Sequence, residues 1–228
     1  GVKIVFTSAG SPKKWTPLLK SHGITVVHVI SSALFAKKCE EAGVDAVVAE
    51  GFEAGGHNGR EETTTLTLIP NVVESCSLPV IAAGGISSGK SVVAAMTLGA
   101  EGVQIGTRFA VATESSAHPA FKQRVFDTEE GGTMLALKKL APTRLIKNEF
   151  FNQVKALEDA GAETAQLTEL LGKGRAKKGI FEGDMTEGEL EIGQIASMLH
   201  QEETVSEIME DIIADFNKTM SKLSDLKL

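Results

Sequence analysis

The chain has 228 residues, of which 42% are hydrophobic and 23% charged, a composition typical of a globular protein with a substantial core. Its net charge of −7 argues against a nucleic-acid-binding protein, which would present a basic face. Two cysteines are too few for a disulfide framework, and no apolar run reaches the ~20 residues that span a bilayer. We therefore expect a cytoplasmic protein with no nucleic-acid or membrane partner.

Residues 1–109 alternate between strand patterns and helix patterns. The strand patterns are short, rich in β-branched residues and continuously apolar, as in parallel strands that are buried on both faces. Five such strands alternating with helices predict βαβ units and a parallel sheet in an α/β fold. The predicted strands are 2–8, 24–30, 45–50, 78–83 and 101–106, and the predicted helices between them are 13–21, 32–42, 66–76 and 89–98.

The rest of the chain, after about Ala117, is predicted to be helical only. A glycine-rich, charged connection at 172–188 interrupts these helices. The predicted helices are 119–125, 133–140, 145–160, 164–171, 187–200 and 204–223.

Three of the predicted strands end in glycine-containing loops, which read EGFEAGGHNG, AAGGISSG and IGTRF. Ligands of parallel α/β folds bind at the C-terminal ends of the strands, where backbone N–H groups can hold an anion. We therefore expect Gly84 and Gly85, together with Gly106 and Thr107, to hold one phosphate group.

Residues 84–91, GGISSGKS, also match the P-loop pattern G-x-x-x-x-G-K-[ST]. In this alternative the chain is a nucleotide triphosphatase, and Lys90 and Ser91 contact phosphates and magnesium. The neighbouring strand, EGVQIG, lacks the Asp that such a site needs, and the pattern leaves EAGGHNG unexplained. We therefore expect Lys90 and Ser91 to be ordinary residues of the first helical turn.

His57 lies in the loop EAGGHNG, at the ligand end of the predicted sheet. An imidazole can act as an acid, a base or a hydrogen-bond donor near neutral pH. A turn histidine without a role is the alternative, and a metal site with Glu50 and Glu53 lacks a second histidine. We expect His57 to be catalytic, no bound metal, and His28 to be a satisfied core histidine.

The segments EAGGHNG, AAGGI and QIGTRF, followed by TESSAHPAFK and ELEIGQIAS, resemble a known family. It is the family of FMN-dependent (β/α)₈ barrels of the nitronate monooxygenase (2-nitropropane dioxygenase) superfamily, which includes the flavin-dependent enoyl-acyl carrier protein reductases. The resemblance runs from Val2 to the C-terminal helices.

The resemblance implies a TIM-type barrel, of which residues 1–117 hold the last five βα strands. Residues 118–228 would form a helical cover and the final barrel helices. Three βα units are expected to be missing at the N-terminus, so the barrel would need a further N-terminal segment. We also expect a homodimer.

The resemblance implies FMN as the cofactor and His57 as the catalytic residue. Glu50 and Gly55 would lie near the flavin, and Gln194 falls in a motif near the cover of the active site. The residues that would contact the phosphate and ribityl chain are Gly84, Gly85, Gln104, Ile105, Gly106 and Thr107.

Two reactions are consistent with the resemblance. Residues 49–57 read AEG-x-E-x-GGH, as in the reductases, so our first expectation is NAD(P)H-dependent reduction of an enoyl-acyl carrier protein thioester in fatty-acid synthesis. His57 would then orient the thioester carbonyl or protonate the α-carbon. The alternative is oxidation of alkyl nitronates with O₂, in which His57 is a base or an anion partner. An FMN-binding module without activity would need only the phosphate loops.

A basic cluster, Lys173, Arg175, Lys177 and Lys178, is a candidate docking patch for the acidic carrier protein or for a nucleotide phosphate. The alternative is a solvated loop.

Overall fold

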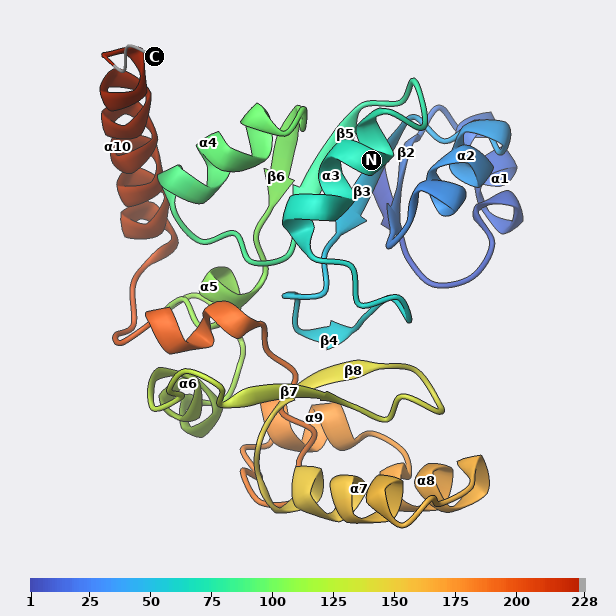
Figure 1. Ribbon diagram of the computed structural model, residues 1–228, viewed down its shortest axis with the longest axis vertical. Coiled ribbons are helices and arrows are strands. Elements are labelled where there is room, and N and C mark those ends of the chain that lie inside the picture. Colours follow the sequence, from blue (N-terminus) through green and yellow to red (C-terminus); the bar gives the residue numbers. More distant parts are fainter. Residues whose placement is uncertain (226–228) are drawn as a thin grey trace. The chain divides into compact units, whose positions relative to one another are not determined.

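The computed structural model describes residues 1–225 (Figure 1). By its internal contacts the chain forms two compact units. The sheet unit comprises Gly1–Phe52, Glu61–Gln104 and Asp215–Leu228, and the hairpin unit comprises Glu53–Arg60 and Ile105–Ala214.

The sheet unit contains a five-stranded parallel sheet in the order β1-β2-β3-β5-β6, which confirms the predicted α/β fold. Because successive strands are neighbours and parallel crossovers are right-handed, the connecting helices gather on one face, as in (β/α) barrels. The strands are β1 (Ile4–Thr7), β2 (Thr25–Ile30), β3 (Ala46–Glu50), β5 (Val80–Ala83) and β6 (Gly102–Gln104); the helices are η1 (Pro12–Lys14), α1 (Thr16–Ser21), α2 (Ala33–Glu41), α3 (Thr65–Val73) and α4 (Gly89–Thr97).

The central strands of this sheet are buried on both faces, since consecutive residues such as Val47, Val48 and Ala49 are all buried. Val27, Val48 and Ala83 form one buried cluster from three neighbouring strands. His28, which points to the opposite face, is 4% exposed, and its Nδ1 lies 2.6 Å from Oγ1 of Thr7. The expectation of a satisfied core histidine is therefore confirmed.

The hairpin unit contains a three-stranded antiparallel sheet in the order β4-β8-β7. This sheet corrects the expectation that the chain after Ala117 is helical only. The strands are β4 (Gly56–His57), β7 (Thr133–Ala136) and β8 (Thr143–Ile146); the helices are α5 (Thr107–Ala110), α6 (Pro119–Phe126), α7 (Glu149–Asp159), α8 (Thr164–Leu171), α9 (Arg175–Ile180) and η2 (Gln194–Met198), and α10 (Val205–Ser224) follows them.

The predicted helix at 133–140 is wrong because pairing with β8 overrides local propensity. Its residues, TMLALKKL, are mostly good helix formers, but Thr133–Ala136 pair with Thr143–Ile146. The packing of the paired side chains in the sheet then decides the conformation of this segment. The predicted helices at 145–160 and 187–200 are too long, since α7 begins after the N-cap Asn148 and the second segment holds only the short η2.

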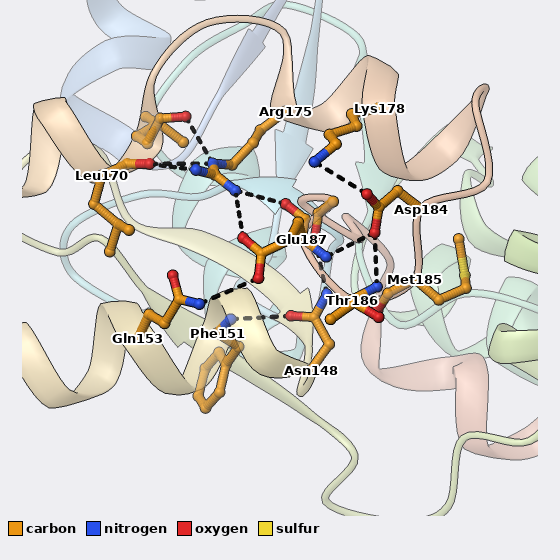
Figure 2. Close-up of polar contacts among 12 residues, drawn as sticks. Asn148, Phe151, Gln153, Leu170, Arg175, Lys178, Asp184, Met185, Thr186 and Glu187 are labelled. Carbon is orange, nitrogen blue, oxygen red and sulfur yellow. Dashed lines mark hydrogen bonds and ion pairs between the residues drawn. The ribbon is translucent and has the colours of Figure 1, made fainter.

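Helices α7, α8 and α9 are joined by an arginine clasp (Figure 2). Arg175 donates to the carbonyl oxygens of Leu170 (Nη2, 2.7 Å) and Glu187 (Nη1, 2.7 Å) and lies 4.4 Å above the ring of Phe150. Gln153 of α7 donates to the Glu187 carboxylate at 3.2 Å. One guanidinium group therefore holds the end of α8 and the segment after α9 against α7.

The same contacts change the interpretation of the basic cluster. Besides Arg175, Lys178 forms an ion pair with Asp184 at 3.0 Å and Lys177 forms one with Glu182 at 2.8 Å. Three of the four cations therefore have a carboxylate partner within the chain, and docking of an acidic carrier protein or a nucleotide phosphate at this cluster stays a prediction.

We predict that Arg175→Gln lowers the free energy of unfolding by about 2–3 kcal/mol, because it removes charged hydrogen bonds and a ring contact from a partly buried site. Lys173→Gln, an exposed change in the same connection, is the matched control and should alter stability by less than about 0.5 kcal/mol. Urea denaturation of both variants measures this. Equal effects would mean that Arg175 is only another surface cation.

Candidate active site

Three neighbouring strands of the sheet unit end in a row of predicted site residues. In the parallel register Glu50 of β3 lies beside Ala83 of β5, and Ala83 lies beside Gln104 of β6. Gly84 follows Ala83 directly in the chain. The sheet therefore brings Glu50, Gly84 and Gln104 to one edge, the carboxyl edge where ligands of such folds bind.

Glu50 is the titratable group of this edge. It is half-buried at the end of β3, and burial raises its pKa to about 7. Removing a carboxylate from water favours its neutral form, so this side chain changes charge in the neutral range. A carboxyl with such a pKa can exchange a proton with a bound ligand near pH 7.

The loop after β5 has the backbone form of an anion cradle. Gly84 and Gly85 have φ values of +92° and +71°, and a Cβ on Gly84 would lie 2.6 Å from the carbonyl oxygen of Gly51. Within residues 1–225 the N–H groups of both glycines donate to no backbone carbonyl. Thr65 holds the loop by donating to the Gly84 carbonyl at 2.9 Å, a role the sequence did not indicate. The loop therefore fits a phosphate group.

The lysine and serine of the P-loop pattern have other roles. Oγ of Ser91 accepts from the N–H of Ser88 at 2.9 Å in a reciprocal capping box. Nζ of Lys90 lies 3.3 Å from Asp215, whose carboxylate also accepts from the Lys90 N–H. Both residues are thus ordinary first-turn residues of α4, as expected, and the triphosphatase alternative loses its two ligand-binding side chains.

The hairpin unit holds the glycines around His57 against another segment of its own backbone. A Cβ on Gly55 would lie 2.4 Å from the carbonyl carbon of Ile192, and Gln194 donates its N–H to the Glu53 carbonyl at 2.9 Å. Gly193 donates its N–H to Oγ1 of Thr107 at 3.0 Å. The backbone that comes close to this glycine loop is therefore residues 192–194.

These contacts give two predicted cofactor residues a structural role. Gly55 has no side chain because Ile192 and Gly193 occupy that space, and the Thr107 hydroxyl is used to hold Gly193. Ile105 is half-buried, whereas Gly106 is exposed and has no atom within 4 Å of an added Cβ. Gly106 therefore keeps open space beside its backbone, which suits a ligand group there.

Gln194 lines a polar pocket within the hairpin unit. The pocket has a volume of about 380 Å³ and is also lined by Ser197 and the turn at 129–133. The role that the motif implies for Gln194, near the cover of the active site, stays a prediction.

His57 is presented on the short strand β4. Its side chain is exposed, and its backbone pairs with Thr143 of β8. Asn58 locks the turn, because its side-chain amide donates to the carbonyl oxygens of Ala54 (2.9 Å) and Gly56 (3.0 Å). His57 is therefore an accessible imidazole on a restrained backbone.

The half-buried carboxyl of Glu191, which lies against Gly56, is not among the predicted site residues. Burial raises the pKa of Glu191, and the charge of His57 partly offsets that rise. The motif ELEIGQIAS contains Glu191, but a single glutamate in a mixed segment gives no sign that it reaches the histidine loop. Among the residues that the structure describes, no group of three or more His, Cys, Asp and Glu side chains is arranged to hold a metal ion.

We predict that Glu50→Gln changes stability in a pH-dependent way. Because the folded-state pKa is raised from 4.5 to about 7, the contribution of Glu50 to stability is present below about pH 4.5 and lost as the pH rises through 7. The difference in the free energy of unfolding, variant minus parent, should therefore increase by about 2–3 kcal/mol from acidic to mildly alkaline pH.

Urea denaturation of the FMN-free proteins across this pH range measures the difference. Glu101→Gln, an exposed change in the same unit, should show no such trend. A constant difference between Glu50→Gln and parent at every pH would contradict the burial argument.

We also predict that Gly55→Ala destabilises the hairpin unit by about 1–3 kcal/mol, because the added methyl group overlaps the backbone of Ile192 and Gly193. Gly106→Ala is the matched control: its φ of −99° suits alanine and its Cβ enters open space. Thermal unfolding separates the two. If Gly55→Ala is as stable as Gly106→Ala, the close approach is not a constraint.

No helix in the part of the chain that the structure describes is long and apolar enough to cross a membrane.

Comparison with known proteins identifies the family. The family model described as nitronate monooxygenase matches residues 1–215. A probable nitronate monooxygenase of Staphylococcus saprophyticus is 36% identical over 193 residues, which cover 78% of this chain and 54% of the relative. One from Bacillus subtilis is 40% identical over 137 residues, covering 57% of this chain and 40% of the relative. The chain spans about half the length of the curated relatives it matches.

Two solved structures agree with this result. FabK from Thermotoga maritima is 38% identical with a TM-score of 0.91, over 97% of this chain and 70% of that chain. The nitroalkane oxidase of Streptomyces ansochromogenes is 28% identical with a TM-score of 0.78, over 97% of this chain and 66% of that chain. With its glycine loops, its exposed histidine and its parallel sheet, the chain belongs to the nitronate monooxygenase family.

Proposed function

We propose that this protein binds FMN and oxidises alkyl nitronates with O₂. The observation that carries the proposal is the exposed His57 imidazole, held on β4 by the pairing of its backbone with Thr143. A nitronate is an anion, and an accessible imidazole is suited to bind it. The family model and the curated relatives favour this reaction over enoyl reduction, which the sequence motifs alone favoured.

The proposed FMN contacts are backbone groups more than side chains. The phosphate is assigned to the N–H groups of Gly84 and Gly85, whose positive φ angles shape an anion cradle. Gln104, Ile105, Gly106 and the backbone of Thr107 are assigned to the phosphate and ribityl chain, following the family resemblance. When bound, FMN supplies the redox chemistry, and the protein supplies position and charge.

Two side chains are proposed to act on protons and charge. His57 holds the nitronate by a hydrogen bond or an ion pair, or removes the proton from the carbon beside a nitro group. Glu50, with a pKa of about 7, is proposed to lie near the flavin and to bind or release a proton there.

Enoyl-thioester reduction is the second candidate. Residues 49–57 read AEGFEAGGH, which matches the reductase pattern, and the similarity to FabK supports it. NAD(P)H would be the electron donor, and a small or carrier-bound enoyl thioester the substrate. His57 would then orient the thioester carbonyl or protonate the α-carbon.

We predict that the purified protein is yellow, takes up oxygen with an alkyl nitronate and does not reduce a crotonyl thioester with NADH or NADPH. His57→Ala should retain FMN, because the proposed phosphate contacts lie elsewhere, and lose about 10²–10⁴-fold in turnover. An oxygen electrode and NAD(P)H absorbance measure the two reactions on the same preparation.

His200→Ala, which removes another exposed histidine, is the control and should retain turnover. Thioester reduction without nitronate oxidation would establish the second candidate instead. Full activity of His57→Ala would remove His57 from the mechanism.

A further inference from the structure

Two buried cations of the hairpin unit fasten residues 108–113 to the segment that leads into α10. Arg108 of α5 and Lys122 of α6 are each 7% exposed. Nζ of Lys122 donates to the carbonyl oxygen of Ala112 at 2.7 Å and forms an ion pair with the Glu202 carboxylate at 2.8 Å. A buried charge is tolerated only where it is paired and hydrogen-bonded, so both cations are fixed parts of this packing.

The guanidinium group of Arg108 is held by two carboxylates. Nε and Nη2 donate to the two carboxylate oxygens of Glu203 at 3.0 Å and 2.9 Å, and Nη2 lies 2.9 Å from Oδ2 of Asp211 in α10. Two parallel hydrogen bonds fix the plane of the guanidinium group as well as its position. The backbone of Glu203 is anchored too, because its carbonyl accepts from the N–H of Thr113 at 2.9 Å.

The two residues before Arg108 are Gly106 and Thr107, which are assigned to the phosphate and ribityl chain of FMN. Oγ1 of Thr107 accepts from the N–H of Gly193 at 3.0 Å, and the Gly106 carbonyl accepts from the N–H of Ala110 at 2.8 Å. In the described residues 1–225, the N–H groups of Gly106 and Thr107 donate to no backbone carbonyl. The side chains of Thr107 and Arg108 thus restrain a short stretch of backbone whose own donors are available.

The charge of Arg108 is already matched within the hairpin unit. Arginine is a common partner of phosphate, but here its guanidinium group is bound by Glu203 and Asp211. One cation and two carboxylates give this group a net negative charge, which does not attract a phosphate. The contacts therefore indicate a geometric role for Arg108 and not a direct ion pair with the cofactor.

We propose that Arg108 is a positioning residue for the FMN phosphate. Its ion pairs with Glu203 and Asp211 hold the backbone of Gly106 and Thr107 in the geometry that receives the phosphate. The proposal rests on FMN binding in the proposed function. Backbone donors bind a ligand tightly only when supporting contacts keep them in the productive geometry, so loss of the support should weaken binding of the phosphate without any loss of a ligand contact.

The test compares the affinities of the flavin-free protein for FMN and for riboflavin, which lacks the phosphate, by quenching of flavin fluorescence. Arg108→Gln should bind FMN about 10-fold more weakly, the effect expected for loss of a supporting residue, and riboflavin as tightly as the parent does. Lys122→Gln removes an equally buried cation that is further along the chain from Gly106. It is the matched control and should keep the parent's ratio of the two affinities, even if it lowers stability.

A second pair of variants tests the sign of the effect. Glu203→Ala removes a negative charge and the main anchor of Arg108. If only the local charge mattered, FMN would bind more tightly; if Arg108 positions the loop, FMN should bind more weakly while riboflavin is unaffected. Glu202→Ala removes the same charge one residue away, from the partner of Lys122, and should leave the ratio unchanged.

Three outcomes would overturn the proposal. They are equal losses of FMN and riboflavin affinity in Arg108→Gln, tighter FMN binding by Glu203→Ala, and a parent that binds the two flavins equally well.

Nitronate oxidation by the parent separates this proposal from the proposed function. If the affinity ratio changes as expected but the parent oxidises no nitronate, the proposed reaction fails and the role of Arg108 stands. If the parent binds FMN and oxidises nitronate while neither Arg108→Gln nor Glu203→Ala changes the ratio, the positioning role fails alone.

Discussion

The close approach of two backbone segments at Gly55 is the constraint on which the hairpin unit depends. Residues 192–194 can reach the histidine loop only because Gly55 has no side chain, and Thr107 then fastens Gly193 in place. The same approach sets Glu191 against Gly56 and leaves His57 accessible on β4. The histidine loop, Thr107 and residues 192–194 lie far apart in the chain but pack together in the structure. The glycines around His57 are therefore needed for packing within the protein, besides any contact with a ligand.

The sheet unit depends on a different constraint, the register of its parallel strands. Because neighbouring strands end at the same level, Glu50, Ala83 and Gln104 form a row, and the glycine loop begins immediately after it. Thr65 holds the backbone of that loop through the Gly84 carbonyl, while within residues 1–225 the N–H groups of Gly84 and Gly85 donate to no backbone carbonyl. An anion site requires backbone N–H donors that are held in place and are not bonded to another acceptor of the protein.

Burial of carboxyl groups is common to both units. Glu50 in one and Glu189 and Glu191 in the other have raised pKa values, and in each case loss of water around the carboxylate is the main cause. Such groups change charge near neutral pH, where an ordinary surface glutamate does not. Arg175 is the contrasting case. Its guanidinium group donates hydrogen bonds to two carbonyl oxygens and packs on a ring, so we expect its charge to stabilise the fold.

Local patterns were sufficient to predict the parallel sheet, the helices that connect it and the loops at its carboxyl edge. Continuous β-branched runs such as residues 24–30 have few alternatives to a buried strand, and glycine pairs mark the turns that follow. Local propensity predicts a helix at 133–140, but the conformation of residues 133–136 depends on pairing with residues 143–146, which local propensity does not describe.

The partners of the glycine loop were likewise decided by tertiary structure alone. Residues 55 and 192 are far apart in the chain, and nothing in either segment specifies that they meet. Glu191 became a candidate only when folding placed its carboxylate beside Gly56 and removed it from water. The pattern of residues thus determined which elements form, whereas long-range packing decided which charged groups lie next to the histidine loop.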